Sequence, residues 1–380
     1  MDVAVRQLQT KKLGCFAHSL NLGAQKVYNV QAISKWSARI RDVIVWIKRS
    51  SMIKTIFKEK QRLLGLPDHS VVLDVKTRWN SLYLMVERFV EQYPAIQAAF
   101  LDPRAKKLMK RDRLEEITDE DFRRAEDFVS LMRMLYTSTL CVSSDKSSTC
   151  GQIIPILQKL KTHLTVKEED STFVATVKEK VWGDLSKRYQ DHDIMAFLEE
   201  ATLMDPRFKG KLSSSDEVWE RLKAAALREM LGEEDAVPVE AQEVEVDEDE
   251  EEEVENPHVV KKPRVSALEE LFAEEDKELR RSLIQQETTA PTILENIRNE
   301  LSVYRGLLPI PTSEDPVHWW WRKKETFPVL SQLSTTYLCV QASSTPSERV
   351  FSTAGNTLSK ERSRLLPEKV NMLIFLNKNC

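Results

Sequence analysis

A run of acidic residues interrupts this chain of 380 residues and limits how the chain can fold. Residues 233–255 are mostly acidic, and residues 247–253 are all aspartate or glutamate. Because so many like charges repel one another and cannot be buried, we expect a disordered, solvated linker over 232–265. This linker separates a long N-terminal part from a shorter C-terminal part. The rest of the chain is basic on balance, although the formal net charge of the whole is -4.

The composition indicates a soluble, intracellular globular protein. Hydrophobic residues make up 41% of the chain and charged residues 31%, which is enough for more than one core. No apolar run approaches the roughly 20 residues that span a bilayer, and residues 1–12 lack the apolar stretch of a signal peptide. The five cysteines are scattered and include no Cys-x-x-Cys pair, so we expect free thiols.

Hydrophobic residues recur mostly at helical spacing. Segments 71–75 and 337–340 have the composition of strands instead, and 13–17 is a third candidate strand. The sequence therefore predicts a mostly α fold with a small α/β part. The helical stripes are Ile40, Val43, Ile44 and Ile47; Phe122, Ala125, Phe128, Val129, Met132, Leu135 and Tyr136; Ile153, Ile156, Leu157 and Leu160; Phe173, Val177, Val181 and Leu185; and Val218, Leu222, Ala225 and Leu231.

One carboxylate near the C-terminus has two interpretations. Thr345, Pro346 and Glu348 have the spacing of a helix start, with Thr345 as the N-cap and Glu348 returning a bond to the N-cap amide. Glu348 could instead be a metal ligand. Spacing alone favours the cap and leaves the ligand open.

Motifs in series extend over nearly the whole chain. The N-terminal ones are Cys15-x-x-His18-x-Leu20-Asn21-Leu22, Thr77-Arg78-Trp79-Asn80-Ser81 and Leu203-Met204-Asp205-Pro206-Arg207-Phe208-Lys209. The C-terminal ones are Trp319-Trp320-Trp321, Ser347-Glu348-Arg349-Val350-Phe351-Ser352-x-Ala354-Gly355, Lys360-x-Arg362-x-x-Leu365 and Leu373-Ile374-Phe375-Leu376.

This series resembles the hAT-superfamily transposases and the domesticated, zinc finger BED domain-containing proteins derived from them. The resemblance implies a ribonuclease H-like core interrupted by a large helical insertion, in which three acids hold divalent metal for DNA strand cleavage. It places a partial core at 1–101, the insertion at 102–231, and a C-terminal dimerisation region that completes the core at 266–380.

The resemblance also implies an incomplete catalytic site. Glu348 stands at the position of the third acid, whereas the other two should precede the Cys15-x-x-His18 motif. We therefore expect an incomplete, N-terminally truncated core that lacks the BED finger and keeps Glu348 as a vestigial acid. Two hard cations need several anionic oxygens to hold them, and a single glutamate does not supply enough. We therefore expect no enzyme activity and no cofactor. Mg²⁺ or Mn²⁺ would be expected to bind only if the missing acids were restored.

Cys15 and His18 supply half the ligands of a zinc site, and no matching pair stands nearby in the sequence. We expect a buried thiol, a core histidine and no metal.

The resemblance places Arg78 and Trp79 beside the catalytic pocket, in contact with DNA. An arginine binds phosphate there and an indole stacks on an extruded base. Trp79 could instead fill the junction between a strand and the next helix, and the incomplete site favours that role. Arg349, Lys360 and Arg362 are further candidates for DNA contact because of their charge.

The three consecutive tryptophans cannot all face one core. We expect at least one to lie at an interface or to donate its indole N–H to a polar partner. In the resembled proteins the C-terminal block supports dimerisation, and packing of the tryptophans against the helical insertion is the alternative. The dimerisation candidates are Trp319, Trp320, Trp321, Phe351, Leu373 and Leu376.

Lys261, Lys262 and Arg264 form a basic cluster that fits a nuclear-import signal, with a plain basic turn as the alternative. The leading interpretation is a nuclear, transposase-derived dimerisation and scaffold module in DNA-associated or transcriptional regulation, without catalysis. Its expected partners are a second copy, DNA and an import receptor, and no membrane. The alternatives are a DNA-binding protein that acts through its residual basic surface, and a fragment of an active transposase or nuclease.

Overall fold

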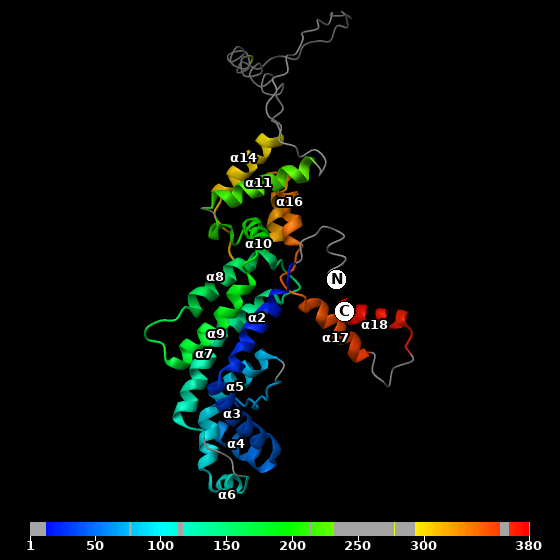
Figure 1. Ribbon diagram of the computed structural model, residues 1–380. Coiled ribbons are helices and arrows are strands. Elements are labelled where there is room, and N and C mark those ends of the chain that lie inside the picture. The colour runs from blue at the N-terminus through cyan, green and yellow to red at the C-terminus, as the bar shows by residue number, and fades with distance from the viewer. Residues whose placement is uncertain are drawn as a thin grey trace, which may run out of the picture. The chain divides into compact units, whose positions relative to one another are not determined.

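The computed structural model describes residues 13–75, 78–112, 117–212, 215–231, 277, 293–357 and 365–379. Every regular element within these ranges is a helix (Figure 1). The mostly α fold is therefore confirmed. The acidic linker and the basic cluster Lys261, Lys262 and Arg264 lie outside the described residues.

The three candidate strands are wrong. Segment 13–17 runs directly into helix α2 (Phe16–Gln25), and 337–340 contains the end of α16 (Pro328–Leu338). Residues 71–75 bond to helices instead of to a strand: Arg41 donates to Asp74 through Nε and Nη2, at 2.7 Å each, and the Val75 N–H donates to Ser81 Oγ at 2.8 Å. The expected small α/β part is thus helix and irregular chain in the described residues, and the ribonuclease H-like core is not confirmed.

The chain divides into two compact units. The first contains Met1–Val218, Leu308–Lys323 and Ser334–Cys380, and the second contains Trp219–Leu307 and Lys324–Leu333. The second unit holds α14 (Ile293–Gly306), most of α11 (Asp216–Leu231) and the start of α16. The boundaries predicted for the domains at 101, 231 and 265 stay predictions. The other helices of the first unit are α3 (Gln31–Arg49), α4 (Ser51–Leu63), α5 (Trp79–Leu101), α6 (Pro103–Asp112), α7 (Asp119–Val142), α8 (Ile153–Leu164), α9 (Thr172–Arg188), α10 (His192–Met204), α15 (Pro316–Lys323), α17 (Thr345–Thr357) and α18 (Pro367–Asn379).

Aromatic side chains join α3, α5 and α7 in the core of the first unit. Trp36 of α3 meets Phe128 of α7 edge to face, with ring centroids 5.6 Å apart. Tyr93 of α5 stacks on Phe122 of α7 at 4.1 Å. Offset and edge contacts of this kind add roughly 0.5–1.5 kcal/mol to the free energy gained by burial. The predicted stripes in α3 and α7 are therefore core faces, as expected.

The chemistry of the N-cap sets where α7 begins. The Thr118 hydroxyl accepts from the Asp121 N–H at 3.1 Å, and Asp121 Oδ2 accepts from the Thr118 N–H at 3.2 Å. This reciprocal box satisfies two amides that the first turn would leave without a partner. A change at either residue would weaken the start of the longest core helix.

The second unit has its own small core. Tyr304 of α14 lies edge to face with Trp219 at 6.1 Å and with Phe327 at 6.0 Å. Glu300, which is buried, accepts from the amides of Val329 at 3.1 Å and Leu330 at 2.9 Å. A carboxylate of α14 thereby caps the positive N-terminal end of α16.

Within the described ranges, none of the helices has the length and apolarity that crossing a bilayer requires.

Candidate functional site

Asp205 and Arg207 form a buried ion pair just after α10. Arg207 donates to Asp205 from Nε at 2.9 Å and from Nη2 at 2.7 Å, and its Nη2 also donates to the Ser148 carbonyl at 3.1 Å. The Asp205 side chain is fully buried and that of Arg207 is 6% exposed. The pair therefore fixes the turn at 148–151 against the end of α10.

The turn at 148–151 is joined in turn to the segment that precedes α17. Thr149 Oγ1 donates to Gln341 Oε1 at 2.9 Å and accepts from the Ala342 N–H at 2.9 Å. The Ala342 carbonyl accepts from the Phe16 N–H at 2.7 Å. The motifs that contain Cys15 and Asp205 are thus joined through the segments 148–151 and 341–342 in the first unit.

Cys15 lies at this junction as the N-cap of α2. Its Sγ accepts from the amides of His18 and Ser344, at 3.4 Å each, and lies 3.7 Å from Ser343 Oγ. Burial alone would raise the pKa of this thiol, but hydrogen bonds from Ser344, His18 and Ser343 outweigh burial and hold the pKa below its ordinary value. The Cys15 side chain caps a helix and ties it to the C-terminal segment.

The expectation of a core histidine is wrong, because His18 is exposed. His18 is the fourth residue of the Cys15-x-x-His18 motif and lies on the solvent-facing side of α2, whereas Phe16 and Leu20 of the same helix are buried. In the parts of the chain that the structure describes, no three His, Cys, Asp or Glu side chains come together as metal ligands.

The tryptophan run of α15 has two buried members and one exposed member. Trp320 donates its indole N–H to the Met204 carbonyl at 2.8 Å, and Trp319 meets Trp320 edge to face at 4.9 Å. Trp321 is 63% exposed and stacks with His318 at 5.7 Å. The expected indole donor is therefore present, and Trp320 packs on the end of α10. A role of these residues in dimerisation stays a prediction.

Glu348 lies in the first turns of α17, where the predicted cap is one residue out of register. The helix begins at Thr345, so Ser344 is the N-cap in place of Thr345. Glu348 Oε1 accepts from the Ser344 hydroxyl at 2.7 Å, and its own amide donates to the Ser344 carbonyl. The Ser344 N–H donates to Cys15 Sγ at 3.4 Å, and the helix begins one residue earlier than the proline position indicates.

The residues expected to contact DNA differ in exposure. Trp79 opens α5 and is 2% exposed, whereas Arg78 and Arg349 are exposed. Lys360 and Arg362 lie outside the described residues. DNA contact by any of the five stays a prediction, and Trp79 fills the start of a helix, with no strand before it.

Helices α17 and α18 pack on each other and leave large apolar side chains uncovered (Figure 1). Phe351 is 73% exposed and Phe375 is 66% exposed. On α18, Met372, Leu373 and Leu376 are exposed as well, and Val370 is buried. So much apolar surface on two adjacent helices is typical of an interface with another chain. We call this the apolar hairpin face: Phe351, Met372, Leu373, Phe375 and Leu376.

Comparison with known proteins identifies the same region. Residues 300–380 match the hAT family C-terminal dimerisation region, and residues 13–131 match the ZBED1 RNase-like helical domain. The chain is thus a relative of the hAT-derived, zinc finger BED-type proteins. The apolar hairpin face lies entirely within the matched dimerisation region.

Curated relatives support this assignment at low identity. Zinc finger BED domain-containing protein 4 of Homo sapiens is 26% identical over 96% of this chain, which covers 29% of that protein. Zinc finger BED domain-containing protein RICESLEEPER 3 of Oryza sativa is 27% identical over 94% of the chain, which covers 46% of that protein. A protein of Talaromyces stipitatus that is named as a candidate transcriptional regulator is 25% identical over 89% of the chain, which covers 35% of it. The chain spans less than half the length of each of these relatives.

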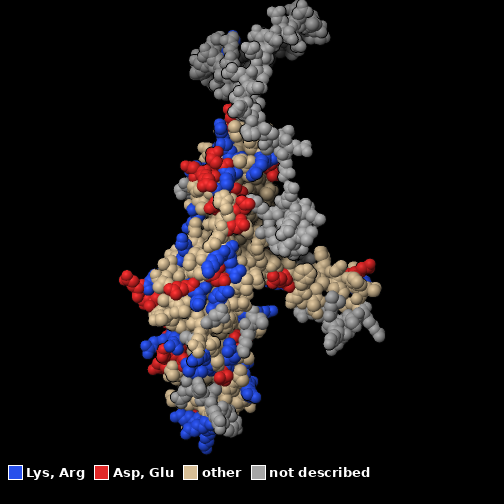
Figure 2. Space-filling view, in the orientation of Figure 1, with Lys and Arg blue, Asp and Glu red and all other residues tan. Residues whose placement is uncertain are grey.

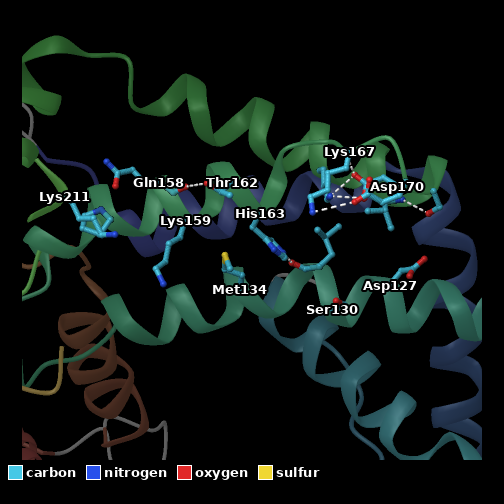
Figure 3. A pocket seen from close by; sticks show the side chains of 16 residues that line it. Asp127, Ser130, Met134, Gln158, Lys159, Thr162, His163, Lys167, Asp170 and Lys211 are labelled. Carbon is cyan, nitrogen blue, oxygen red and sulfur yellow. Dashed lines mark hydrogen bonds and ion pairs between the residues drawn. The ribbon is translucent and has the colours of Figure 1, made fainter. Parts of the chain in front are cut away.

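An open groove of about 870 Å³ lies between α7, α8 and the start of α9 (Figure 3). The matches to the hAT-type proteins give no function for this groove. Part of its charged lining is paired: Lys178 donates to Asp170 Oδ2 at 2.7 Å, and Lys167 lies 3.7 Å from Glu169. His163 Nε2 bonds to the Leu131 carbonyl at 2.9 Å. Both pairs lie within residues 167–178, and a lining that carries both signs of charge defines no class of ligand.

The sequence did not predict a basic surface on α4 and α6, away from the hAT motifs. Helix α4 carries four cations and one acid, and α6 carries five cations and one acid. The sequence feature that could have predicted this surface is a local excess of lysine and arginine in the two helices. The negative charge of the acidic linker cancels this excess in the net charge of the chain. The charged residues of the two helices whose side chains the structure describes are the cations Lys54, Lys58, Lys60, Arg62, Arg104, Lys106, Lys107 and Lys110 and the acid Glu59.

Proposed function

We propose that the chain is a dimerisation and scaffold module of a nuclear, transposase-derived protein that takes part in DNA-associated or transcriptional regulation without transposase catalysis. The observation that carries the proposal is the apolar hairpin face in the matched dimerisation region. Its exposed phenyl rings and aliphatic side chains would be buried against the same face of a second copy, as in a twofold dimer.

Co-expression of two differently tagged copies tests the dimer. Phe351→Ser combined with Phe375→Ser is expected to abolish co-purification of the two tags, because burial of these rings drives association. Leu140→Ser combined with Leu308→Ser is the matched control, since both leucines are exposed and lie outside the face. Loss of co-purification in the control alone would contradict the assigned interface.

The absence of catalysis is part of the same proposal. The Ser344 hydroxyl donates a hydrogen bond to Glu348 Oε1, and this bond gives the carboxylate a structural role at the start of α17. Two-metal cleavage requires further carboxylates around the same cations. In a plasmid-nicking assay with Mg²⁺ or Mn²⁺, the chain and Glu348→Gln are expected to give the same background. Nicking by the native chain that Glu348→Gln removes would contradict the proposal.

A nuclear location and a regulatory role are supported by the names of the relatives, which are zinc finger BED proteins and a candidate transcriptional regulator. We expect a fluorescent fusion of the chain to accumulate in the nucleus. Substitution of Lys261, Lys262 and Arg264 by alanine is expected to move the fusion to the cytoplasm, and unchanged accumulation would exclude this cluster as the import signal.

A further inference from the structure

Six cations of α4 and α6 are exposed, on two helices that an ion pair between Arg104 and Glu59 joins. We call them the basic face: Lys54, Lys58 and Arg62 of α4, and Lys106, Lys107 and Lys110 of α6. Figure 2 shows blue side chains gathered over the position of α6 at the lower end of the view. None of these residues belongs to a motif of the resemblance or to the apolar hairpin face.

Helix geometry places the α4 cations in a row. Lys54, Lys58 and Arg62 are four residues apart, which at 1.5 Å per residue separates them by roughly 6 Å along the axis. The opposite side of α4 carries Ile53 and Phe57 in the core. The charges therefore point outward from a fixed support.

The α6 cations point outward in the same way. Ala105 and Met109 of α6 are buried, so Lys106, Lys107 and Lys110 lie on the remaining, solvent-facing side. Only Leu108 of this helix is a further apolar residue, and it is half-buried. Helix α6 thus offers charge without an apolar stripe.

Ion pairs join the two helices and neutralise the acids that lie near the face. Arg104 Nη2 lies 2.6 Å from Glu59 Oε2, and Lys60 Nζ lies 3.3 Å from Asp102 Oδ2. Among the side chains that the structure describes, Asp68 is a further acid with a contact here, at 3.6 Å from Lys58. The first pair joins α6 to α4, and the second joins α4 to the residue before α6. Because Arg104 and Lys60 are not members of the face, these pairs leave most of the outward charges to an external anion.

We propose that the basic face binds the phosphate backbone of duplex nucleic acid without reading its sequence. A duplex carries one negative charge per roughly 1.7 Å of its axis, so several phosphates can meet several of these cations at once. An anionic membrane would suit the charge, but helices that bind membranes bury an apolar stripe beside their cations. Helix α6 has no such stripe, and the exposed apolar residues of α4, Met52 and Leu63, stand at its two ends. The proposal does not depend on dimerisation.

Fluorescence anisotropy of the full chain with a labelled DNA duplex of mixed sequence tests the proposal. Six phosphate contacts predict an association constant that falls roughly 10³-fold between about 50 and 200 mM salt. Lys106→Gln/Lys107→Gln/Lys110→Gln is expected to bind roughly tenfold more weakly or worse at low salt and to lose about half of the salt dependence. Lys54→Gln/Lys58→Gln/Arg62→Gln is an independent variant with the same expectation.

The control removes the same charge elsewhere. Lys159→Gln/Lys180→Gln/Lys187→Gln changes exposed lysines of α8 and α9 and is expected to bind like the native chain. An equal loss in this control would assign binding to net charge and overturn the proposal. So would a native chain that binds no duplex at low salt, or one that binds vesicles of phosphatidylserine and phosphatidylcholine in preference to duplex.

Discussion

The Arg207 guanidinium holds the Asp205 carboxylate through two parallel hydrogen bonds, of 2.9 and 2.7 Å, at the end of α10. The Arg207 N–H adds a third bond to Asp205 Oδ1 at 3.1 Å. The same Asp-Pro-Arg turn occurs after α5, where Arg104 donates to Asp102 from its N–H, Nε and Nη2, each at 3.0 Å. The two turns share their geometry but differ in exposure, since the Arg104 side chain is 51% exposed.

Loss of Asp205 is expected to destabilise the first unit strongly. Asp205→Ala leaves the Arg207 guanidinium buried without a counter-charge, which typically costs about 3–5 kcal/mol of the free energy of unfolding. Urea denaturation measures the loss. Arg104→Ala at the other turn is the control and should cost far less, because the Arg104 side chain is 51% exposed and Lys60 still lies 3.3 Å from Asp102 Oδ2. Equal losses at the two turns would contradict the assigned importance of burial.

Two glycines are expected to respond to alanine in opposite directions. A Cβ at Gly151 would lie 2.8 Å from both the Ala201 carbonyl oxygen and Asp205 Cβ, so Gly151→Ala should cost about 1–3 kcal/mol through overpacking. Gly183 of α9 has open space around it, and Gly183→Ala should stabilise by roughly 0.5–1 kcal/mol. Thermal melting of both variants checks the signs, and a stabilised Gly151→Ala would refute the close packing of the turn on α10.

The cap that Glu300 forms on α16 predicts a local effect in the second unit. Glu300→Ala removes the acceptor of the Val329 and Leu330 amides, and hydrogen bonds to a charged group are worth roughly 1.5–3 kcal/mol. Hydrogen exchange at these two amides should accelerate in the variant. Glu295→Ala, at an exposed position of the same helix, is the control and should leave their exchange unchanged.

Lys209 predicts a pH dependence. Burial lowers the pKa of Lys209 from 10.5 to about 8, so between these values the unfolded chain binds more protons than the folded chain. The contribution of Lys209 to the free energy of unfolding therefore rises with pH across that window. Lys209→Met should abolish this part of the rise, whereas Lys211→Met, at an exposed position, should retain it.

Denaturation midpoints at a series of pH values compare the variants. Burial also raises the pKa of Cys150 from 9.0 to about 12, and that of Tyr28 and Tyr189 to about 12. These groups oppose the rise above about pH 9, so the comparison is best made below that pH. Identical pH profiles for the native chain and Lys209→Met would contradict the prediction.

Periodicity predicted the helices well because burial repeats every turn. Ile40, Val43, Ile44 and Ile47 are all buried in α3, as expected from their spacing. The strand at 71–75 failed for a physical reason: β-branched composition indicates an extended chain, but a strand also needs a neighbour, and here Arg41 and Ser81 supply the hydrogen bonds.

The site was harder to predict than the fold. The motif containing Asp205 and Arg207 was visible, but nothing in it tells a buried ion pair from a solvated turn. For the tryptophans, the sequence indicated that one indole would find a polar acceptor, and only the packing of α15 on α10 identifies Trp320 and the Met204 carbonyl. The basic face could be predicted only by counting the charges of each helix separately, because the acidic linker cancels the positive charge of the face in the net charge of the chain.

The mass of the chain in solution tests dimerisation most directly. Light scattering at micromolar concentration should give twice the chain mass of 43.9 kDa, and Phe351→Ser/Phe375→Ser should give the mass of one chain. A native chain that remains strictly monomeric under these conditions would contradict the dimerisation module proposed for the apolar hairpin face.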